Sequence, residues 1–278
     1  MSEKSILITG CSSGLGFDAA ARLRDEGWKV LATCRRAEDA ERLAAMGLES
    51  YVLDLADPDS VARGAERALD LTGGKLFSLY NNGAFALPGA VEDLDRAALR
   101  SIFETNLFGQ FDLIHRLIGA MKANGSGRII NNSSVLGYVV RPFNAAYSST
   151  KFAMEALTDG LRMENRDSPI KIILIEPGPI PSRIRINSRK PFETHIDWKT
   201  SAQKTAYEDY VIPAIYDRDS APSRLERPVS HATDVLLKAL NDTRPQARYH
   251  ATLAPSIVLT LRRLLTTRMM DALLARRP

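Results

Sequence analysis

The stretch Thr9-Gly10-Cys11-Ser12-Ser13-Gly14-Leu15-Gly16 decides the fold of this chain. It follows a short apolar run that is typical of a buried strand, and a helical pattern from Phe17 to Glu26 comes after it. Between a strand and a helix, glycines let the backbone approach a pyrophosphate, and the N–H groups of the first helical turn bind phosphate oxygens. The stretch predicts a dinucleotide-binding loop, with a glycine-rich turn without a ligand as the alternative. The residues expected to contact the dinucleotide are Gly10, Ser12, Ser13, Gly14, Leu15 and Gly16.

Short apolar runs alternate with helical patterns through the first two thirds of the chain, and each run is long enough for one buried strand. The runs are Ile6 to Thr9, Lys29 to Thr33, Ser50 to Leu53, Leu76 to Asn81, Arg128 to Asn132 and Lys171 to Glu176. Parallel strands need crossover connections, which helices supply. The pattern predicts an α/β fold: a doubly wound parallel sheet of the Rossmann type, with helices on both faces and ligands at the carboxyl ends of the strands.

No shift in composition divides the chain, so a single domain over 1–278 is expected. Pro177-Gly178-Pro179-Ile180-Pro181 ends the regular alternation, and the polar, proline-containing stretch 183–230 is interpreted as a substrate lid with helical pieces. The segments expected after it are a helix near His231 to Leu240, an edge strand near Arg248 to Thr252 and a basic C-terminal helix over 253–278.

Composition excludes several classes of protein. The net charge of +4 comes from interspersed acids and bases, so no nucleic-acid partner is expected. The two cysteines and four histidines lack the spacing of metal ligands, so no metal is expected, and the cysteines fit a reducing compartment, the cytoplasm. No window approaches the roughly twenty apolar residues of a membrane span. The arginine-rich C-terminal helix allows at most peripheral membrane contact, and closing the cleft or contacting a subunit are its alternatives.

The second expected strand ends in Thr33-Cys34-Arg35-Arg36, where an enzyme that prefers NAD usually has an acid that binds the adenosine ribose. A guanidinium there can bind a 2′-phosphate, so Arg35, assisted by Arg36, predicts NADP(H), although NAD(H) stays open. The alternative is an exposed arginine pair that begins a helix. Asp54 and Leu55, after the third strand, are placed to meet the adenine edge, but Asp54 could equally form a turn or a helix cap.

The pair Tyr147 and Lys151 lies on one face of an expected helix, because residues i and i+4 share a face. A free tyrosine has a pKa of about 10, and the Lys151 ammonium together with an oxidised nicotinamide ring would lower the pKa of Tyr147. Ser134 ends the strand before this helix, so its hydroxyl is expected to face the same crevice. A carbonyl oxygen that gains charge as hydride arrives needs such a pair of hydroxyls. The three residues therefore predict proton transfer during the reduction of a carbonyl.

Together these motifs resemble the short-chain dehydrogenase/reductase family over nearly the whole chain. The motifs that carry the resemblance, in order, are the glycine loop, Asn81-Asn82-Gly83-Ala84, Asn106, Ser134, Tyr147 with Lys151, and Pro177-Gly178. Within the family, the chain is most similar to bacterial NADP-dependent aldehyde reductases and to the related hydroxysteroid and retinol dehydrogenases. The family usually has Asn-Asn-Ala-Gly where this chain has Gly83 before Ala84, which puts the local conformation and the cofactor affinity in question.

The resemblance implies roles for individual residues. Tyr147 would be the proton donor or acceptor, and Lys151 would hold the nicotinamide ribose. Ser134 would orient the substrate oxygen, and Asn106 would anchor a water of the proton relay. The remaining residues implied to bind the cofactor are Asn81, Gly83, Pro177, Gly178 and Ile180.

The function expected from this resemblance is the interconversion of a small lipophilic carbonyl compound and its alcohol, with NADP(H) as the hydride carrier. The family also implies a homo-oligomer. Two alternatives stay open: a reductase of polar sugar or acyl-thioester ketones, and a non-catalytic NADP-sensing or scaffold protein on the same fold.

Overall fold

The computed structural model describes residues 4–181, 183–216 and 226–275. At its centre is a seven-stranded sheet in which all neighbouring strands are parallel, in the order β3-β2-β1-β4-β5-β6-β7. The strands are β1 (Ser5–Ile8), β2 (Lys29–Cys34), β3 (Glu49–Val52), β4 (Ser78–Asn81), β5 (Gly127–Asn132), β6 (Ile170–Glu176) and β7 (Arg248–His250). The doubly wound parallel sheet predicted from the sequence is confirmed.

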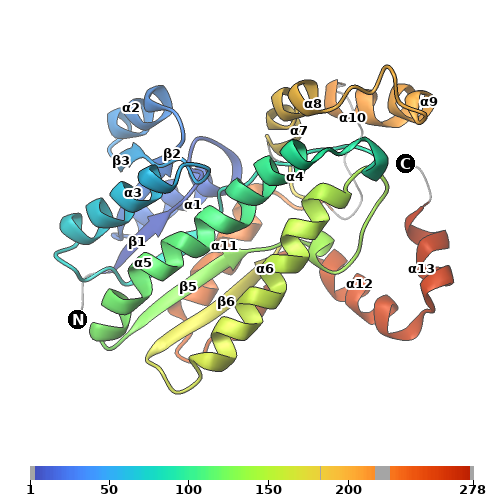
Figure 1. Cartoon of the computed structure of the whole chain (residues 1–278). Coiled ribbons are helices and arrows are strands. Elements are labelled where there is room, and N and C mark those ends of the chain that lie inside the picture. The colour runs from blue at the N-terminus through green and yellow to red at the C-terminus, as the bar shows by residue number, and fades with distance from the viewer. Residues whose placement is uncertain (1–3, 182, 217–225, 276–278) are drawn as a thin grey trace.

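Helices cover both faces of the sheet because its strands are apolar on both sides. Along β1, Ile6 and Ile8 belong to one buried cluster and Leu7 belongs to another. Burying such a side chain stabilises the fold by roughly 1.5–3 kcal/mol. The first face is covered by α1 (Gly14–Asp25), α2 (Ala37–Ala45) and α11 (Val229–Asn241). The second face is covered by α3 (Pro58–Leu71), α5 (Gly109–Ala123) and α6 (Ala145–Glu164) (Figure 1).

The order of the strands creates a crevice beside β1. The chain leaves β1 toward β2 on one side and later returns to β4 on the other side. The connection after β1 is α1, on the first face of the sheet. The connection after β4 runs through η1 (Val91–Asp93), α4 (Arg96–Phe103) and the π-helical turn η2 (Glu104–Phe108) to α5, on the second face. Since the two connections diverge, the carboxyl ends of β1 and β4 are left open, as in doubly wound folds that bind ligands there.

The segment after β6 forms several short helical pieces that lie together beyond one end of the sheet (Figure 1). They are α7 (Ile184–Asn187), α8 (Arg189–His195), α9 (Lys204–Ala206), the π-helical turn η4 (Tyr207–Val211) and α10 (Ile212–Tyr216). Phe192 and Tyr207 are buried in an apolar cluster with Leu87. Tyr207 also donates a hydrogen bond to Asp93, at 2.7 Å, which ties the segment to η1. Residues 217–225 of the expected lid lie outside the described residues.

Two predicted boundaries differ from the structure. The first helix begins at Gly14 rather than at Phe17, because Gly14 itself takes up the turn with a φ of +60°. The last strand ends at His250 rather than at Thr252, because Thr252 is the N-cap residue of the following helix.

The C-terminal segment forms two helices where one was predicted over 253–278. They are α12 (Leu253–Leu264) and α13 (Thr267–Leu274), and they extend away from the sheet (Figure 1). The break occurs because Leu265 is extended and the Thr266 hydroxyl accepts a hydrogen bond from the backbone N–H of Met269, at 3.4 Å, which caps α13. Residues 276–278 lie outside the described residues. Within the described part of the chain, no helix has the length and apolar character needed to cross a bilayer.

Candidate active site

A cleft of about 690 Å³ lies at the carboxyl ends of the strands. Its walls come from the glycine loop, the ends of β4, β5 and β6, the start of α6, and α7 and α10. The predicted site residues that line it are Gly10, Ser12, Ser13, Gly14, Leu15, Gly83, Ser134, Tyr147, Lys151, Pro177, Gly178 and Ile180. The predicted site residues outside its lining are Gly16, Arg35, Asp54, Leu55, Asn81 and Asn106. The structure therefore brings most of the predicted residues together in one cleft.

Glycines in the loop permit close contact between backbones. A Cβ at Gly10 would lie 2.6 Å from Cα of Gly83, and Gly10 itself has a φ of +74°. A Cβ at Gly16 would overlap the carbonyl oxygen of Gly10. Since no larger residue fits these positions without a shift, the loop lies flat and leaves the amino end of α1 facing the cleft. Gly16 thus supports the loop from behind instead of lining the cleft.

Tyr147 and Lys151 lie one helical turn apart at the start of α6. Lys151 is 1% exposed, and its ammonium lies 5.6 Å from the centre of the Tyr147 ring. Lys151 Nζ donates a hydrogen bond to the backbone carbonyl oxygen of Asn132, at 2.6 Å. Because Asn132 is the last residue of β5, this bond fixes the ammonium between α6 and the sheet.

Burial governs the protonation of this pair. It raises the pKa of Tyr147 to about 12, and a hydrogen bond with Ser134 acts in the opposite direction. Burial also lowers the pKa of Lys151 to about 8, against the opposing charge of Glu155. The lowering expected from Lys151 together with an oxidised nicotinamide ring stays a prediction, because among the protein's own residues burial has the largest influence on the pKa of Tyr147. The phenol is consequently protonated at neutral pH.

Ser134 lies two residues after the end of β5, at the N-cap of η3 (Val135–Gly137). Its hydroxyl oxygen accepts a hydrogen bond from the backbone N–H of Leu136, at 3.1 Å. The next backbone N–H, that of Val135, donates to the carbonyl oxygen of Pro177, at 2.9 Å. These bonds hold the serine in the cleft beside the Pro177-Gly178 turn, and both predicted elements meet there.

Gly178 makes room for the C-terminal part of the chain. A Cβ at this position would overlap the hydroxyl oxygen of Thr252 and lie 2.9 Å from Cβ of Ala254. The cleft wall at Gly178 is therefore backed by the residues that join β7 to α12.

Asn106 lies in the π-helical turn η2 and is fully buried. Its Oδ1 accepts a hydrogen bond from the backbone N–H of Phe85, at 3.0 Å, and its Nδ2 donates one to the carbonyl oxygen of Phe85, at 2.9 Å. Its nitrogen also lies 3.3 Å from the hydroxyl oxygen of Thr150 on α6. Asn106 thus ties the loop after β4 to α6, and it does not line the cleft.

The reversed Gly83-Ala84 pair has a packing explanation. Neither residue has a positive φ, so the reversal places no strained backbone in the loop. A Cβ at Gly83 would lie 3.0 Å from Leu55 Cδ1, and the Gly83 N–H donates to the hydroxyl oxygen of Thr9, at 2.9 Å. The position is held close to β1.

Asn81 lies below the cleft. It is fully buried and donates a hydrogen bond to Asn131 Oδ1, at 2.9 Å. The next residue, Asn82, lines the cleft and donates to the carbonyl oxygen of Thr9, at 3.0 Å. Sequence reasoning selected Asn81 and missed Asn82, because the register of this loop cannot be read from the motif.

The residues expected at the adenosine end differ in exposure, and Leu55 is buried in the core. Arg35 is exposed, and Arg36 forms an ion pair with Asp39, at 3.1 Å. Arg42, which sequence reasoning missed, donates to the carbonyl oxygen of Ser12, at 2.7 Å. Asp54 forms the turn that was its alternative interpretation, since its carboxylate accepts from the backbone N–H of Ala56, at 3.0 Å.

A comparison with protein families identifies this architecture. The family model described as short chain dehydrogenase matches residues 4–192. The chain belongs to the short-chain dehydrogenase family. The family resemblance predicted from the motifs is confirmed.

Other short-chain dehydrogenases and related oxidoreductases match most of the chain. The oxidoreductase YbbO of Escherichia coli K12 is 38% identical over 98% of this chain and 94% of its own length. The 17-beta-hydroxysteroid dehydrogenase type 6 of Rattus norvegicus is 30% identical over 98% of this chain and 88% of its own length.

One further relative and one solved structure are also similar to this chain. The NADPH-dependent 1-acyldihydroxyacetone phosphate reductase of Schizosaccharomyces pombe is 34% identical over 66% of this chain and 62% of its own length. A crystal structure of a short-chain dehydrogenase from Streptomyces avermitilis superposes with a TM-score of 0.78 at 27% identity, covering 98% of this chain and 97% of that one. The chain is therefore an oxidoreductase of the short-chain dehydrogenase family.

Proposed function

We propose that this short-chain dehydrogenase interconverts a lipophilic carbonyl compound and its alcohol with NADP(H), and that Tyr147 transfers the proton. The observation that carries the proposal is the convergence of Tyr147, Lys151 and Ser134 in one cleft beside the glycine loop. Acyclic and cyclic ketones or aldehydes would enter as small-molecule substrates.

The residues present fit a dinucleotide. The amino end of α1 is open to the cleft, and at Gly10 and Gly16 a side chain would fill the space that keeps the loop flat. Ser12, Ser13 and Gly14 line the cleft at this point and can donate hydrogen bonds to phosphate oxygens. Pro177, Gly178 and Ile180 line its other end, where the nicotinamide would lie near Tyr147.

The cofactor supplies a hydride to the carbonyl carbon when it is bound. Ser134 and Tyr147 present two hydroxyl groups to the carbonyl oxygen, and they stabilise the charge that develops on it. Tyr147 then gives its proton to that oxygen. The Lys151 ammonium, held by Asn132, stabilises the resulting phenolate. Asn106 holds α6 against the loop after β4 and so keeps Tyr147 in position.

The preference for NADP(H) over NAD(H) rests on the charges beside the glycine loop. Arg35 is exposed and available to a 2′-phosphate, whereas Arg36 is paired with Asp39. The S. pombe relative is named as NADPH-dependent, which agrees with this preference. The variant Arg35→Gln is expected to raise KM for NADPH by roughly tenfold, since a charged hydrogen bond is worth about 1.5–3 kcal/mol. KM for NADH should not change, and an equal effect on both cofactors would contradict the assignment.

The lining of the cleft supports, as substrate, an apolar compound with an anionic group. Leu136, Phe143, Val211, Ala214 and Ile215 supply apolar surface. The charged residues of the lining are Arg141, Arg183, Arg185 and Lys151, and none of the described lining residues is acidic. The rat relative is named for a hydroxysteroid, which is apolar, and the S. pombe relative is named for an acyldihydroxyacetone phosphate, which carries an anionic phosphate.

A matched pair of substrates tests this proposal. An alkanal and the ω-carboxylate of the same chain length should differ in KM, with the carboxylate lower. Arg141→Gln should remove the difference, while Arg166→Gln, an exposed arginine paired with Asp167, should preserve it. Equal KM values of the wild type for the two substrates would show that the cleft has no preference for an anionic group on the substrate. That result would leave the proposal of a carbonyl reductase intact.

The principal test separates an enzyme from an NADP-sensing protein on the same fold. The wild type should oxidise NADPH with members of an aldehyde panel, and Tyr147→Phe should lose most of that rate while still binding NADPH. A wild type that binds NADPH tightly yet reduces no carbonyl, sugar ketone or acyl-thioester ketone would favour the sensor.

The remaining expectations complete the proposal. The segment 183–230 would act as a substrate lid within a single domain, since α7 and α10 line the cleft. Cys11 and Cys34 are buried free thiols, as expected in the cytoplasm. A homo-oligomer is expected from the family, and sedimentation velocity would establish its size.

A further inference from the structure

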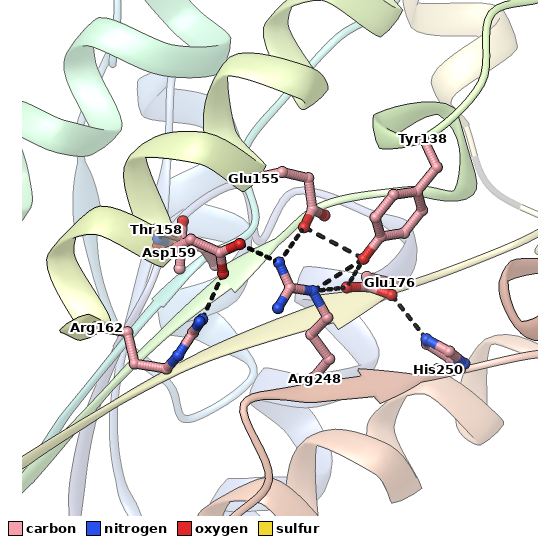
Figure 2. Close-up of polar contacts among 9 residues, drawn as sticks. Tyr138, Glu155, Thr158, Asp159, Arg162, Glu176, Arg248 and His250 are labelled. Carbon is pink, nitrogen blue, oxygen red and sulfur yellow. Dashed lines mark hydrogen bonds and ion pairs between the residues drawn. The ribbon is translucent and has the colours of Figure 1, made fainter. Parts of the chain in front are cut away.

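A polar cluster with two buried carboxylates lies between α6 and the strands β6 and β7. Tyr138, Glu155, Glu176, Arg248 and His250 form it, and their side chains point toward one another (Figure 2). They come from four parts of the chain: the residue after η3, α6, β6 and β7. Glu155 and Glu176 are 7% and 0% exposed. Two buried carboxylates are costly unless they are paired, so the cluster requires an explanation.

Arg248 holds the cluster together. Its guanidinium lies 3.2 Å from the Glu155 carboxylate and 3.1 Å from the Glu176 carboxylate. It also donates to the hydroxyl oxygen of Tyr138, at 3.0 Å, and to Asp159, at 2.6 Å. Tyr138 in turn donates to Glu176. His250 approaches the other oxygen of Glu176, at 2.9 Å.

Glu155 connects this cluster to the proposed proton-transfer site. It lies one helical turn after Lys151, so Tyr147, Lys151 and Glu155 follow one another along one face of α6. The segment Ser133 to Gly137 packs directly on Glu155, because a Cβ at Gly137 would lie 3.1 Å from Glu155 Cγ. Tyr138, the next residue, lies 3.3 Å from the Glu155 carboxylate. Ser134 is therefore part of a segment whose far end is held by the cluster.

We propose that Glu155 is a positioning residue of the active site: held by Arg248, it keeps the Ser134 segment against α6 and supports the ammonium of Lys151. The proposal rests on the proposed function, because it assigns Glu155 an effect on Tyr147, Lys151 and Ser134. Glu155 does not line the cleft, and it acts through its neighbours.

Electrostatics give this arrangement a measurable consequence. The Glu155 carboxylate raises the pKa of Lys151, against the larger lowering by burial. Burial and Glu176 raise the pKa of Glu155 to about 7, while Arg248 favours its charged form. The charged or titratable groups that face Glu155 are Lys151 and Asp159 on α6, Tyr138 after η3, Glu176 on β6 and Arg248 on β7, with His250 behind Glu176. Removing the carboxylate would leave Lys151 with burial alone, so its ammonium would lose its proton at lower pH.

Two conservative variants of the full-length protein test the proposal. Glu155→Gln keeps the shape and removes the charge. Asp159→Asn is the matched control, because Asp159 binds the same arginine from the same helix but lies a further turn from Lys151. For Glu155→Gln we expect kcat to fall roughly tenfold and the alkaline limb of the pH profile to move down on the order of one unit. KM for NADPH should stay unchanged, and Asp159→Asn should match the wild type in all three.

A measurement without turnover separates this proposal from the proposed function. The ¹³C resonance of Lys151 Cε, assigned by its loss in Lys151→Met, reports the pKa of the lysine directly. A lower pKa in Glu155→Gln supports the positioning role even if no carbonyl substrate is found. An unchanged lysine pKa with unchanged kcat, whether or not the variant melts earlier, would show that the cluster serves only stability. If Glu155→Gln does not fold, Tyr138→Phe, which loses only the hydroxyl, should show the fall in kcat, and wild-type kcat there would overturn the proposal.

Discussion

The Lys151 ammonium donates to the carbonyl oxygen of Asn132 across 2.6 Å, which fixes a buried cation between the sheet and α6. Because burial lowers the pKa of Lys151 to about 8, the side chain is protonated below that value and loses its proton above it. We predict that kcat/KM for carbonyl reduction is level on the acid side of about 8 and falls as pH rises through it. Lys151→Met should have a low kcat/KM that does not fall over this range of pH. A wild-type rate that climbs through the same range would be inconsistent with the assignment.

Replacement of Gly109 should destabilise the fold without touching the cleft. A Cβ at this first residue of α5 would overlap the carbonyl oxygen of Leu55, so the helix must shift. We expect Gly109→Ala to lower the free energy of unfolding by about 1–3 kcal/mol. Gly119 lies in the same helix with nothing near its Cβ position, so Gly119→Ala should raise that free energy by about 0.5–1 kcal/mol. Urea denaturation of both variants measures the contrast.

Replacement of Gly16 should weaken cofactor binding before it affects folding. A Cβ there would overlap the carbonyl oxygen of Gly10 and lie 2.6 Å from the Asn82 amide nitrogen, so the loop would move into the cleft. Gly16→Ala should weaken NADPH binding by more than tenfold in a fluorescence titration, because the phosphate donors would be displaced. Gly160→Ala, in α6 with open space around it, is the control. Comparable affinities of the two variants for NADPH would contradict the assignment of the glycine loop as the phosphate-binding site.

Replacement of the Asn106 amide should lower both the stability and the activity of the protein. In Asn106→Asp, the carboxylate would face the carbonyl oxygen of Phe85 and lose the donor to Thr150. We expect a loss of about 1–3 kcal/mol in the free energy of unfolding, together with a lower kcat. Thermal melting and steady-state kinetics would check both, and a variant as stable as the wild type would show that the π-helical turn does not depend on this amide.

Local patterns predicted the fold and the central residues of the site. The glycine loop and the spacing of Tyr147 and Lys151 are contained within eight residues or fewer of sequence. Each pattern is interpretable on its own, because the turn, the helix face and the strand end are local properties. The residues around Gly109 were not found, since the close approach of Leu55 depends on how two distant segments pack.

Contacts between distant segments explain most of what the sequence did not reveal. Arg248 and Glu155 are 93 residues apart, and nothing in a single sequence pairs them. The break between α12 and α13 depends on one threonine cap, which is a weak signal inside an amphipathic pattern. The effect of burial on the pKa of Tyr147 was not foreseen for a related reason, because the depth of burial is a property of the whole fold.

The fit of Gly178 against Thr252 has a consequence for biosynthesis. The motifs of the dinucleotide site up to Gly178 are synthesised before Thr252 and Ala254, which back the wall of the cleft at this glycine. A nascent chain therefore carries all of its reactive groups before it has a closed compartment for them.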